Sequence, residues 1–400
     1  MKNDRITIAM MGVRGRGRSV LRDFCRQPEI DVAWICDPDQ NVVEPAMKIV
    51  EELRGRRPPL ITDIRRALDD QTVDAVVMAT PIHWHAAGTI LACDAGKDVY
   101  VEKPASHNVR EGRLMVEAAR LNRRVVQHGT QLRSLGVVKR FVECARSGGL
   151  GRVLVAKAWN VQLRRSIGRR PDEPVPAGVD YDIWTGPVPM LPFNRNRYHG
   201  TVNWNWHYGC GDIGNDGVHQ LDIARWALGV ESPREVAGMG RKMHFDDDQQ
   251  TPDTMTISFD FGGKMLLFEQ RLWNRYMLEG CENGVAAYGS EGMAQVGRWD
   301  DGWGFRVFDS KGALVEKDVE QLDDQVHIRD FLDSMRTRQP PAAEIAEGHR
   351  STVLCHLGNI VARTGRAIRW DGERETVVGD ADADRYTRRE YREHWSAADR

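Results

Sequence analysis

The sequence predicts an α/β protein in which a doubly wound parallel sheet is followed by an α+β domain with a large, mostly antiparallel sheet. Strand-like apolar runs alternate with helical segments up to about residue 128, and long strand-like runs separated by glycine turns dominate after about residue 152. The length of 400 residues and the 41% hydrophobic content allow two buried units. We therefore predict a first domain over residues 1–128 and a second, ending in a C-terminal tail, over residues 129–400.

The first strand, Ile6 to Met11, leads into a turn that contains Gly12, Gly15 and Gly17. A dinucleotide pyrophosphate binds the free N–H groups at a helix N-terminus, and glycines let the backbone approach it closely. Asp37 ends the second apolar run and lies 20 residues after Gly17, the spacing expected for the acid that binds the ribose hydroxyls. These features predict a Rossmann domain that binds NAD(P). The charge of Asp37 would repel a 2′-phosphate, so NAD is favoured over NADP.

The glycine turn departs from the G-x-G-x-x-G pattern at its middle position. Arg14 stands where the second glycine is expected, and the glycine is displaced to position 15. Arg14 leaves NADP open, because a guanidinium near Asp37 could meet an added phosphate. We predict that Arg14 and Arg16 belong to the cofactor site together with the glycines. The alternative is a structural turn that binds nothing.

Further alternating elements complete the first domain. We expect helices over residues 41–53, 64–70, 85–95 and 109–121, and strands over residues 73–80, 99–101 and 125–128. In such a sheet, ligands bind at the carboxyl ends of the strands. The residues predicted at this rim, where a nicotinamide would lie, are Thr80, Pro81, His85, Glu102 and Lys103.

Strand-like segments dominate the second domain. We expect strands over residues 153–163, 235–243, 254–261, 264–273, 284–289, 293–298 and 305–308. Tight glycine turns between several of them predict hairpins and hence an antiparallel sheet. The Pro- and aromatic-rich loop from Arg164 to Gly211 is far longer than an ordinary connection and is expected to line a site. Helices are predicted over residues 213–228, 326–338 and 345–364.

Glu102, Lys103 and Pro104 form the second chemical element. A lysine at a strand end beside a nicotinamide can hydrogen-bond the hydroxyl being oxidised and stabilise the developing alkoxide. The alternative is a Lys-Pro pair that merely ends an edge strand. The upstream glycine turn favours the functional interpretation.

The third element is the glycine-rich segment that leads into the predicted helix 213–228. Asn215, His219 and Asp222 follow at i, i+4 and i+7, so one helix face would present all three. Histidine is a natural proton acceptor near neutral pH, although a hydrogen-bonded core histidine is the alternative. Aromatic side chains stack well on sugar faces. We therefore predict a substrate pocket that includes Trp204, Trp206 and His207.

These elements, in this order, resemble the family of glucose-fructose oxidoreductase, inositol dehydrogenase and MocA. The resemblance covers nearly the whole chain and includes the strand end Ala79-Thr80-Pro81 with His83-Trp84-His85 after it. It implies a two-domain dehydrogenase that uses NAD(P) to move a hydride to or from a sugar or cyclic polyol. It also implies that Lys103 and His219 do the proton work.

One departure from the family affects the expected base. The family's aspartate, four residues before the histidine, falls on Asn215 here, and Asp216 is expected to point about 100° away around the helix. An asparagine can hold a substrate hydroxyl but cannot take a proton. We predict catalytic roles for Lys103, His219 and Asn215. Asn215, Asp216 and Asp222 are also predicted to bind the substrate or orient the histidine.

The functional hypothesis is an NAD-dependent dehydrogenase that acts on a sugar or polyol derivative. A rival from another class uses the same residues for transient oxidation, elimination of a glycosidic substituent and final reduction, so that it is a glycosidase by outcome. A third possibility is a non-catalytic sensor that binds NAD. NADH formation, aryl glycoside cleavage without net NADH, and bound NAD that no substrate reduces would distinguish the three.

Composition limits the partners. The formal net charge of −2 gives no reason to expect nucleic acid or an anionic membrane, and no apolar run reaches the roughly 20 residues of a membrane span. Seven scattered cysteines without a C-x-x-C pair suit a reducing compartment, so we expect a cytoplasmic protein. His83 and His85 have no evident third ligand, and no metal is expected. A sheet with an exposed face predicts a homo-oligomer, dimer or tetramer.

Overall fold

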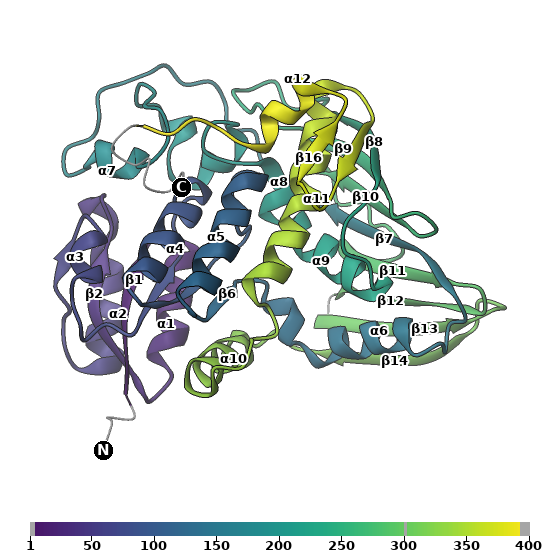
Figure 1. Ribbon diagram of the computed structural model, residues 1–400, viewed down its shortest axis with the longest axis horizontal. Coiled ribbons are helices and arrows are strands. Elements are labelled where there is room, and N and C mark those ends of the chain that lie inside the picture. The colour runs from purple at the N-terminus through teal and green to yellow at the C-terminus, as the bar shows by residue number, and fades with distance from the viewer. Residues whose placement is uncertain (1–4, 300–301, 393–400) are drawn as a thin grey trace.

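The computed structural model describes residues 5–299 and 302–392 and contains two sheets side by side (Figure 1). All strand pairs in the first sheet are parallel. Its order departs from the chain order after β1, which places the loops after β1 and β4 next to each other. In spatial order its strands are β3 Leu60–Ile61, β2 Ile30–Cys36, β1 Ile6–Met11, β4 Ala75–Met78, β5 Asp98–Val101 and β6 Val126–His128.

Helices cover both faces of this sheet. On one face α4 and α5 pack with the strands into one core, and on the other face α1, α2 and α10 form a second core. Helix α10, which comes late in the chain, contributes Ile328, Phe331 and Leu332 to that second core. The bounds of these helices are α1 Arg16–Cys25, α2 Glu44–Arg54, α3 Arg65–Leu68, α4 His85–Asp94, α5 Val109–Leu121 and α10 Asp324–Thr337.

The second sheet has ten strands and is antiparallel except where β7 pairs with β10. The two sheets together confirm the predicted fold class. Most predicted strands are present with slightly shifted ends, and β14, β15 and β16 extend the sheet at its edges. In spatial order its strands are β14 Leu314–Glu320, β13 Gly302–Asp309, β12 Gly292–Trp299, β11 Asn283–Gly289, β7 Val153–Val161, β10 Met265–Arg271, β9 Thr254–Asp260, β8 Glu235–Arg241, β15 Ile368–Asp371 and β16 Thr376–Val378.

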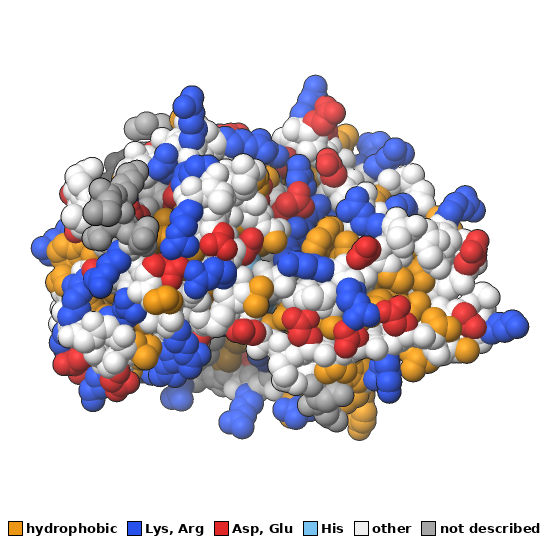
Figure 2. All heavy atoms as spheres, turned by 90° about the horizontal axis from the view of Figure 1, so that it is seen from below, with side chains coloured by type: hydrophobic (Ala, Val, Ile, Leu, Met, Phe, Trp, Pro, Cys, Tyr) orange, Lys and Arg blue, Asp and Glu red, His pale blue; other side chains and the backbone are white. Residues whose placement is uncertain are grey.

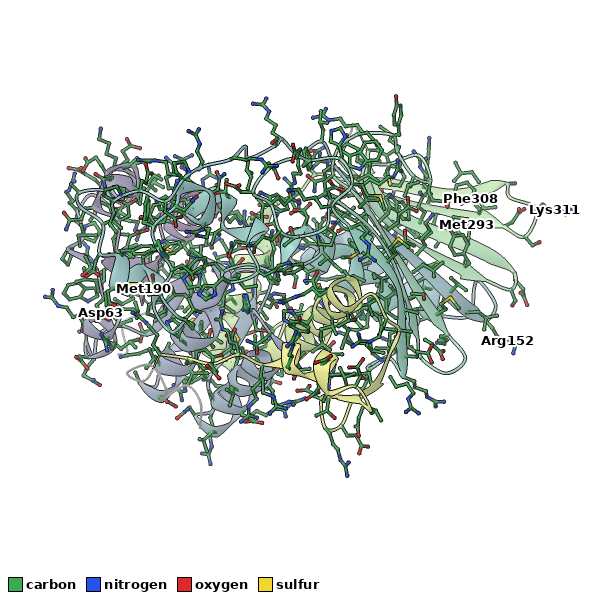
Figure 3. The ribbon with its side chains drawn as sticks, turned by 90° about the horizontal axis from the view of Figure 1, so that it is seen from above. Asp63, Arg152, Met190, Met293, Phe308 and Lys311 are labelled. Atoms are coloured by element: carbon green, nitrogen blue, oxygen red, sulfur yellow. The ribbon has the colours of Figure 1, made fainter. Side chains whose placement is uncertain are left out.

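Helices α6 (Gly136–Arg146), α9 (Gly217–Leu228) and α11 (Ile345–Thr364) pack on one face of the ten-stranded sheet, where they form the largest core. Side chains alternate along each strand, so every second residue faces the other way. On that opposite face, apolar residues form one row across five strands. The paired residues of the row are Met265, Val155, Tyr288, Met293 and Phe308. In Figure 3, Met293 and Phe308 are neighbours toward the far end of the sheet.

The predicted helix 213–228 is two helices. Helix α8 spans Gly211–Asn215, α9 begins at Gly217, and Asp216 lies between them with φ −116°. The single continuous helix expected over residues 213–228 is therefore interrupted at Asp216. The helices over 109–121 and 345–364 have the predicted ends.

The long segment between β7 and α8 bridges the two halves of the molecule. Its backbone bonds to the first domain at the end of β2: Asp180 N–H donates to Pro38 O at 2.8 Å, and Gln40 N–H donates to Gly178 O at 2.9 Å. Trp84, which lies in the loop after β4, donates a hydrogen bond from Nε1 to Trp184 O at 3.0 Å. Helix α7 (Tyr181–Thr185) and its neighbours thus form a roof over the carboxyl ends of the first sheet, as Figure 1 shows.

The surface carries charges of both signs. Figure 2 shows lysine and arginine side chains intermixed with aspartate and glutamate over the lower face. This agrees with the formal net charge of −2. Among the described residues, no helix is both long enough and apolar enough to cross a membrane.

Candidate functional site

The glycine turn joins β1 to α1 and is shaped for close backbone approach. Gly12 has φ 82°, and a Cβ atom there would lie 2.8 Å from the Ala79 backbone. A Cβ atom on Gly17 would lie 2.1 Å from Gly12 O. Only glycine fits at these two positions, because larger residues would force β1, α1 and the loop after β4 apart. The N-terminus of α1, with its free N–H groups, consequently opens toward the ends of the strands.

Asp37 follows β2 and is buried, with 6% exposed. Its Oδ2 accepts a hydrogen bond from Val13 N–H, and its Oδ1 accepts one from Asp39 N–H, both at 3.0 Å. Burial raises the pKa of Asp37 to about 6, against the effect of these two donors. The carboxylate is thus held beside the glycine turn and is ionised at neutral pH.

A cavity of about 320 Å³ extends from this turn along the carboxyl ends of β1, β2, β4 and β5. Ten of the eleven residues predicted from the sequence to bind a cofactor line it, and Gly17, the eleventh, is buried behind the turn. Asn215 lines its far end. The predicted residues on its wall are Gly12, Arg14, Gly15, Arg16, Asp37, Thr80, Pro81, His85, Glu102 and Lys103, of which Lys103 was also predicted to be catalytic.

Arg16 and Glu102 form an ion pair on this wall. Arg16 Nε lies 2.9 Å from Glu102 Oε1, and Arg16 Nη1 lies 2.7 Å from Asp324 Oδ2. Burial by itself would raise the pKa of Glu102, but Arg16 and Lys103 outweigh it and lower that pKa. Glu102 is therefore an anion that contributes negative charge beside the Lys103 ammonium.

Lys103 meets the junction of α8 and α9 at the far end of the cavity. Its Nζ donates to Asn215 O, lies 3.3 Å from Asn215 Oδ1 and lies 3.4 Å from Asp216 Oδ1. The Lys103–Pro104 peptide bond is cis. The structure therefore brings together two segments that are more than one hundred residues apart in the chain, as the sequence hypothesis requires for this lysine.

Asp216 is anchored from two sides. Its Oδ2 accepts hydrogen bonds from Gln162 and from Arg164, which also pairs with Asp212 at 3.0 Å. Burial would raise the pKa of Asp216, but the charges of Lys103 and Arg164 outweigh it and hold that pKa below its usual range. An ionised carboxylate therefore lies next to Lys103 at the break between the helices, together with the amide of Asn215.

His219 lies on the first turn of α9 and is 9% exposed. Burial, together with the nearby Lys103 ammonium, lowers the pKa of its imidazole to about 4. Its Nδ1 is buried and has no hydrogen-bond partner among the described residues. The ring is consequently neutral at physiological pH and has a nitrogen free to accept or hold a proton.

The carboxylate of Asp222 forms its hydrogen bonds with Arg133 and Ser351. Arg133 forms a bidentate pair with it, Nε to Oδ2 at 2.7 Å and Nη2 to Oδ1 at 2.8 Å, and Ser351 Oγ donates to Oδ1. Asp216, His219 and Asp222 are not among the residues that line the cavity bordered by Lys103 and Asn215. The helix that was expected to present Asn215, His219 and Asp222 together is divided at Asp216, with Asn215 on α8 and the other two on α9.

The three predicted aromatic residues also lie outside this cavity. Trp204 is buried at the end of a short helical segment, with 8% exposed. Trp206 and His207 line a different cavity, next to α11 and the C-terminal segment. The structure therefore corrects their expected position at the substrate end of the cleft.

Other residues of the long segment line the first cavity. Asn203 Nδ2 donates to Asn215 Oδ1 at 3.2 Å, and His199 Nε2 lies 2.7 Å from Asp39 Oδ2. Both side chains border the cavity, as do Trp184 and Val202. The unusual length of the segment predicted its proximity to a site, but not which residues reach it, since that depends on how the segment folds over the sheet.

The lining fits a dinucleotide such as NAD. The Gly12–Gly15 turn and the α1 N-terminus offer N–H groups without a Cβ in the way, and Asp37 offers acceptors to ribose hydroxyls. Thr80 Oγ1 on the cavity wall is buried without a hydrogen-bond partner among the described residues. A bound polar ligand would satisfy it.

Comparisons with known proteins agree with this geometry. Residues 6–130 match the family model described as "Oxidoreductase family, NAD-binding Rossmann fold", and residues 157–397 match "Oxidoreductase family, C-terminal alpha/beta domain". The alpha-N-acetylgalactosaminidase of Shewanella oneidensis is 29% identical over 122 residues, 30% of this chain. That match spans only 27% of the relative's length.

Solved structures share the fold over almost the whole chain. The WlbA dehydrogenase of Bordetella pertussis, in complex with NADH and UDP-GlcNAcA, has a TM-score of 0.68 at 17% identity and covers 92% of this chain and 99% of its own. A levoglucosan dehydrogenase in complex with NADH and levoglucosan has a TM-score of 0.69 at 16% identity, over 91% of this chain and 99% of its own. At these identities the likeness establishes the fold alone.

Proposed function

The chain belongs to the Gfo/Idh/MocA oxidoreductase family, as its sequence motifs predicted, and we propose that it transfers a hydride between NAD and a hydroxyl of a sugar or cyclic polyol derivative. One observation carries this proposal. The Lys103 ammonium, from the end of β5, and the Asn215–Asp216 junction, from the second domain, meet at the end of the cavity that begins at the glycine turn. A polar substrate at that end would lie between the two domains.

Gly12 and Gly15 would hold the cofactor pyrophosphate, Asp37 the ribose, and Thr80 and Glu102 the nicotinamide half. When bound there, NAD supplies the hydride acceptor. Lys103 donates a hydrogen bond to the substrate oxygen and stabilises negative charge that develops on it. The His219 imidazole accepts the hydroxyl proton. Burial and Lys103 keep its pKa at about 4, so the ring is unprotonated at neutral pH and its nitrogen lone pair is available. Asp216 and Asn215 position the ammonium group.

NAD rather than NADP is the proposed cofactor. Two acidic side chains border the cavity among the described residues, and Asp37, unlike Glu102, has no arginine or lysine partner. Its charge repels a 2′-phosphate. Arg14, which also lines the cavity, carries the opposite charge and forms the argument for NADP. The ratio of kcat/KM with NAD to that with NADP decides between them.

The direct test is a dehydrogenase assay. We expect absorbance at 340 nm to rise when the protein is incubated with NAD and one member of a panel of sugars and polyols. Lys103→Met should abolish the rise, while Lys139→Met, at an exposed position on α6, should leave it unchanged. No reduction of NAD by any sugar, together with no oxidation of NADH by any keto-sugar, would contradict the proposal. Bound NAD that no substrate reduces would instead indicate a sensor.

A second candidate is a glycosidase that oxidises its substrate transiently. The match to 27% of the length of the Shewanella galactosaminidase favours it. Oxidation of a ring hydroxyl by NAD acidifies the neighbouring C–H, so that His219 could remove that proton and the glycosidic substituent could leave. Water would then add to the resulting unsaturated ketone, and the hydride would return from NADH to the carbonyl. Cleavage of aryl glycosides by the NAD-loaded protein, without net NADH, would identify this activity.

We also propose a homo-oligomer that forms through the row of apolar residues on the ten-stranded sheet. Met265 is 42% exposed, and Val155, Tyr288, Met293 and Phe308 continue the row in register. Light scattering after gel filtration should give a dimer or tetramer. Met293→Lys should shift it toward the monomer, and Lys311→Glu, at the tip of a hairpin, should not. A wild-type monomer would exclude the assembly.

We propose that the protein is located in the cytoplasm. All seven cysteines are free, and six of them are buried. Buried unpaired thiols suit a reducing environment. Cell fractionation with an antibody against the protein would test the proposal, and recovery outside the cytoplasm would contradict it.

A further inference from the structure

A second cavity, of about 360 Å³, lies between α11, the loop after β5 and the C-terminal segment. The C-terminal segment follows α12 (Ala381–Asp384) and returns over the first domain toward α7 (Figure 1). Arg389 fixes it there by pairing with Glu111 at 2.7 Å, and Tyr391 OH donates to the same carboxylate oxygen at 2.7 Å. The residues that line this cavity are all different from those that line the first.

The mouth of the second cavity is positively charged. Three arginines and one glutamate, Glu390, line it. Arg389 is neutralised by the buried Glu111. Arg388 pairs with Asp384 at 3.0 Å, but this pair is solvent-exposed and therefore weak, so Arg388 can also bind an anion. Arg363 is different: its guanidinium carbon lies 3.9 Å from the centre of the Tyr386 ring and 4.9 Å from that of Trp206. Within the residues that the structure describes, no carboxylate pairs with it.

A guanidinium that packs against two aromatic rings is restricted in its motion, which favours anion binding. Tyr386 is also a hydrogen-bond partner of Arg363, and the remaining N–H groups of the guanidinium can donate to an anion. Phosphate and carboxylate groups accept such hydrogen bonds from a guanidinium. The mouth therefore has the charge and the geometry of an anion site.

The floor of the cavity is polar, buried and partly unpaired. Asn108 is 4% exposed, and its Oδ1 caps α5 by accepting from Glu111 N–H at 3.0 Å. This bond fixes the orientation of the amide, so the group without a partner is the Nδ2 donor. Asn359, also 4% exposed, donates from Nδ2 to Cys210 O at 2.7 Å, which leaves its Oδ1 acceptor without a partner.

Among the described residues, the floor of the second cavity thus has an unpaired donor, Asn108 Nδ2, and an unpaired acceptor, Asn359 Oδ1. A hydroxyl group can pair with both, because it accepts and donates hydrogen bonds. A hydroxyl can accept from Asn108 Nδ2 and donate to Asn359 Oδ1. Buried amide groups without partners destabilise a fold, so their presence at a cavity wall points to a ligand that satisfies them.

We propose that this second cavity binds a small hydroxylated anion, a sugar phosphate or a sugar acid, which Arg363 and Arg388 hold at the mouth and Asn108 and Asn359 hold at the floor. The first cavity, with its glycine turn, is a separate site. The proposal does not depend on the dehydrogenase function, because no residue of the Lys103 site takes part in it.

Isothermal titration calorimetry of the full chain tests the proposal with glucose 6-phosphate, glucuronate and glucose as probes. We expect at least one of the two anions to bind and glucose to bind at least about tenfold more weakly. The tighter of the two anions identifies the ligand as a phosphate or a carboxylate. Heat from neither anion, or equal affinity for glucose, would overturn the proposal.

Matched arginine variants locate the site. Arg363→Gln should weaken the anion by about tenfold or more, whereas Arg385→Gln should change its affinity less than about twofold. Arg385 also stacks on Tyr386, at 4.8 Å, but does not line the cavity. Arg388→Gln provides a second variant if Arg363→Gln does not fold. Lys103→Met should leave the affinity unchanged, and a loss in that variant would place the anion in the first cavity.

Discussion

The carboxylate of Asp222 could stabilise the fold or bind the substrate. The substitution Asp222→Asn distinguishes these two roles, because the first predicts a loss of stability and the second a loss of kcat/KM. Asp222 and Arg133 are buried, with side-chain exposures of 3% and 5%, and form a bidentate pair. Burial would raise the pKa of Asp222, but Arg133 lowers it from 3.8 to about 2. A difference of this size corresponds to about 2.5 kcal/mol of stability at pH 7.

The substitution also removes the bidentate ionic partner of the buried Arg133, whose remaining partners are Glu347 Oε2 at 3.4 Å and Ala342 O at 3.1 Å. Loss of one partner of a buried pair typically costs about 3–5 kcal/mol. We therefore expect Asp222→Asn to lower the free energy of unfolding by about 3 kcal/mol and to change kcat/KM less than threefold.

Urea unfolding measures this change, with tryptophan fluorescence as the readout. Trp226 is a suitable reporter because Arg133 Cζ lies 4.8 Å from its ring. Since the pKa of Asp222 is depressed, the ionic contribution is present above about pH 4 and is lost as the pH falls through about 2. The difference in the free energy of unfolding between the wild type and Asp222→Asn should therefore become smaller as the pH falls from about 4 to about 2.

Asp246→Asn is the matched control, because the Asp246 side chain is 91% exposed and should change stability by less than about 0.5 kcal/mol. One combination of results would refute the reasoning: unchanged stability of Asp222→Asn with kcat/KM lowered more than tenfold. Asp222 would then act on the substrate, as its spacing from His219 first predicted.

Three further predictions concern the first cavity. Lys103→Met should lower kcat/KM by about 10²- to 10⁴-fold without a shift of the thermal midpoint, because the ammonium stabilises charge on the reacting oxygen; a loss below tenfold contradicts this role. The pH profile of kcat/KM for the sugar, measured at saturating NAD so that Asp37, with its pKa of about 6, does not contribute, should show no acidic limb above about pH 5, because the pKa of His219 is about 4 and the ring loses its proton-accepting form only below that value. A limb centred near 6.5 would exclude His219 as the base. Asp37→Ser should reduce the preference for NAD over NADP by about tenfold or more, as measured by the ratio of kcat/KM values, and an unchanged ratio would assign the preference to other residues.

Local periodicity predicted most of the fold. The helix Val109–Leu121 has an asparagine cap and a continuous apolar stripe, and both are properties of a short stretch of sequence. The same is true of the strands of the first sheet, which are buried on both faces. The missed elements lack such signals: β3 has two residues, and β14 is almost entirely exposed at the sheet edge.

The errors at the site arise from contacts between distant parts of the chain. The break at Asp216 depends on Lys103 and Arg164, which lie about 110 and 50 residues away. Asp222 is recruited by Arg133, and Trp206 packs against Arg363 from α11. The helical spacing of Asn215, His219 and Asp222 contains no information about these partners, so it predicted one continuous helix where the structure has a break and a buried ion pair.

The roof formed by residues 177–184 has a kinetic consequence. It is tied to the end of β2 through Pro38 and Gln40 and to the loop after β4 through Trp84. A coenzyme bound beneath it would be covered on that side, and exit past this segment would require these bonds to open. Opening of the segment would then contribute to the residence time of the coenzyme, which lengthens as the segment is held more firmly.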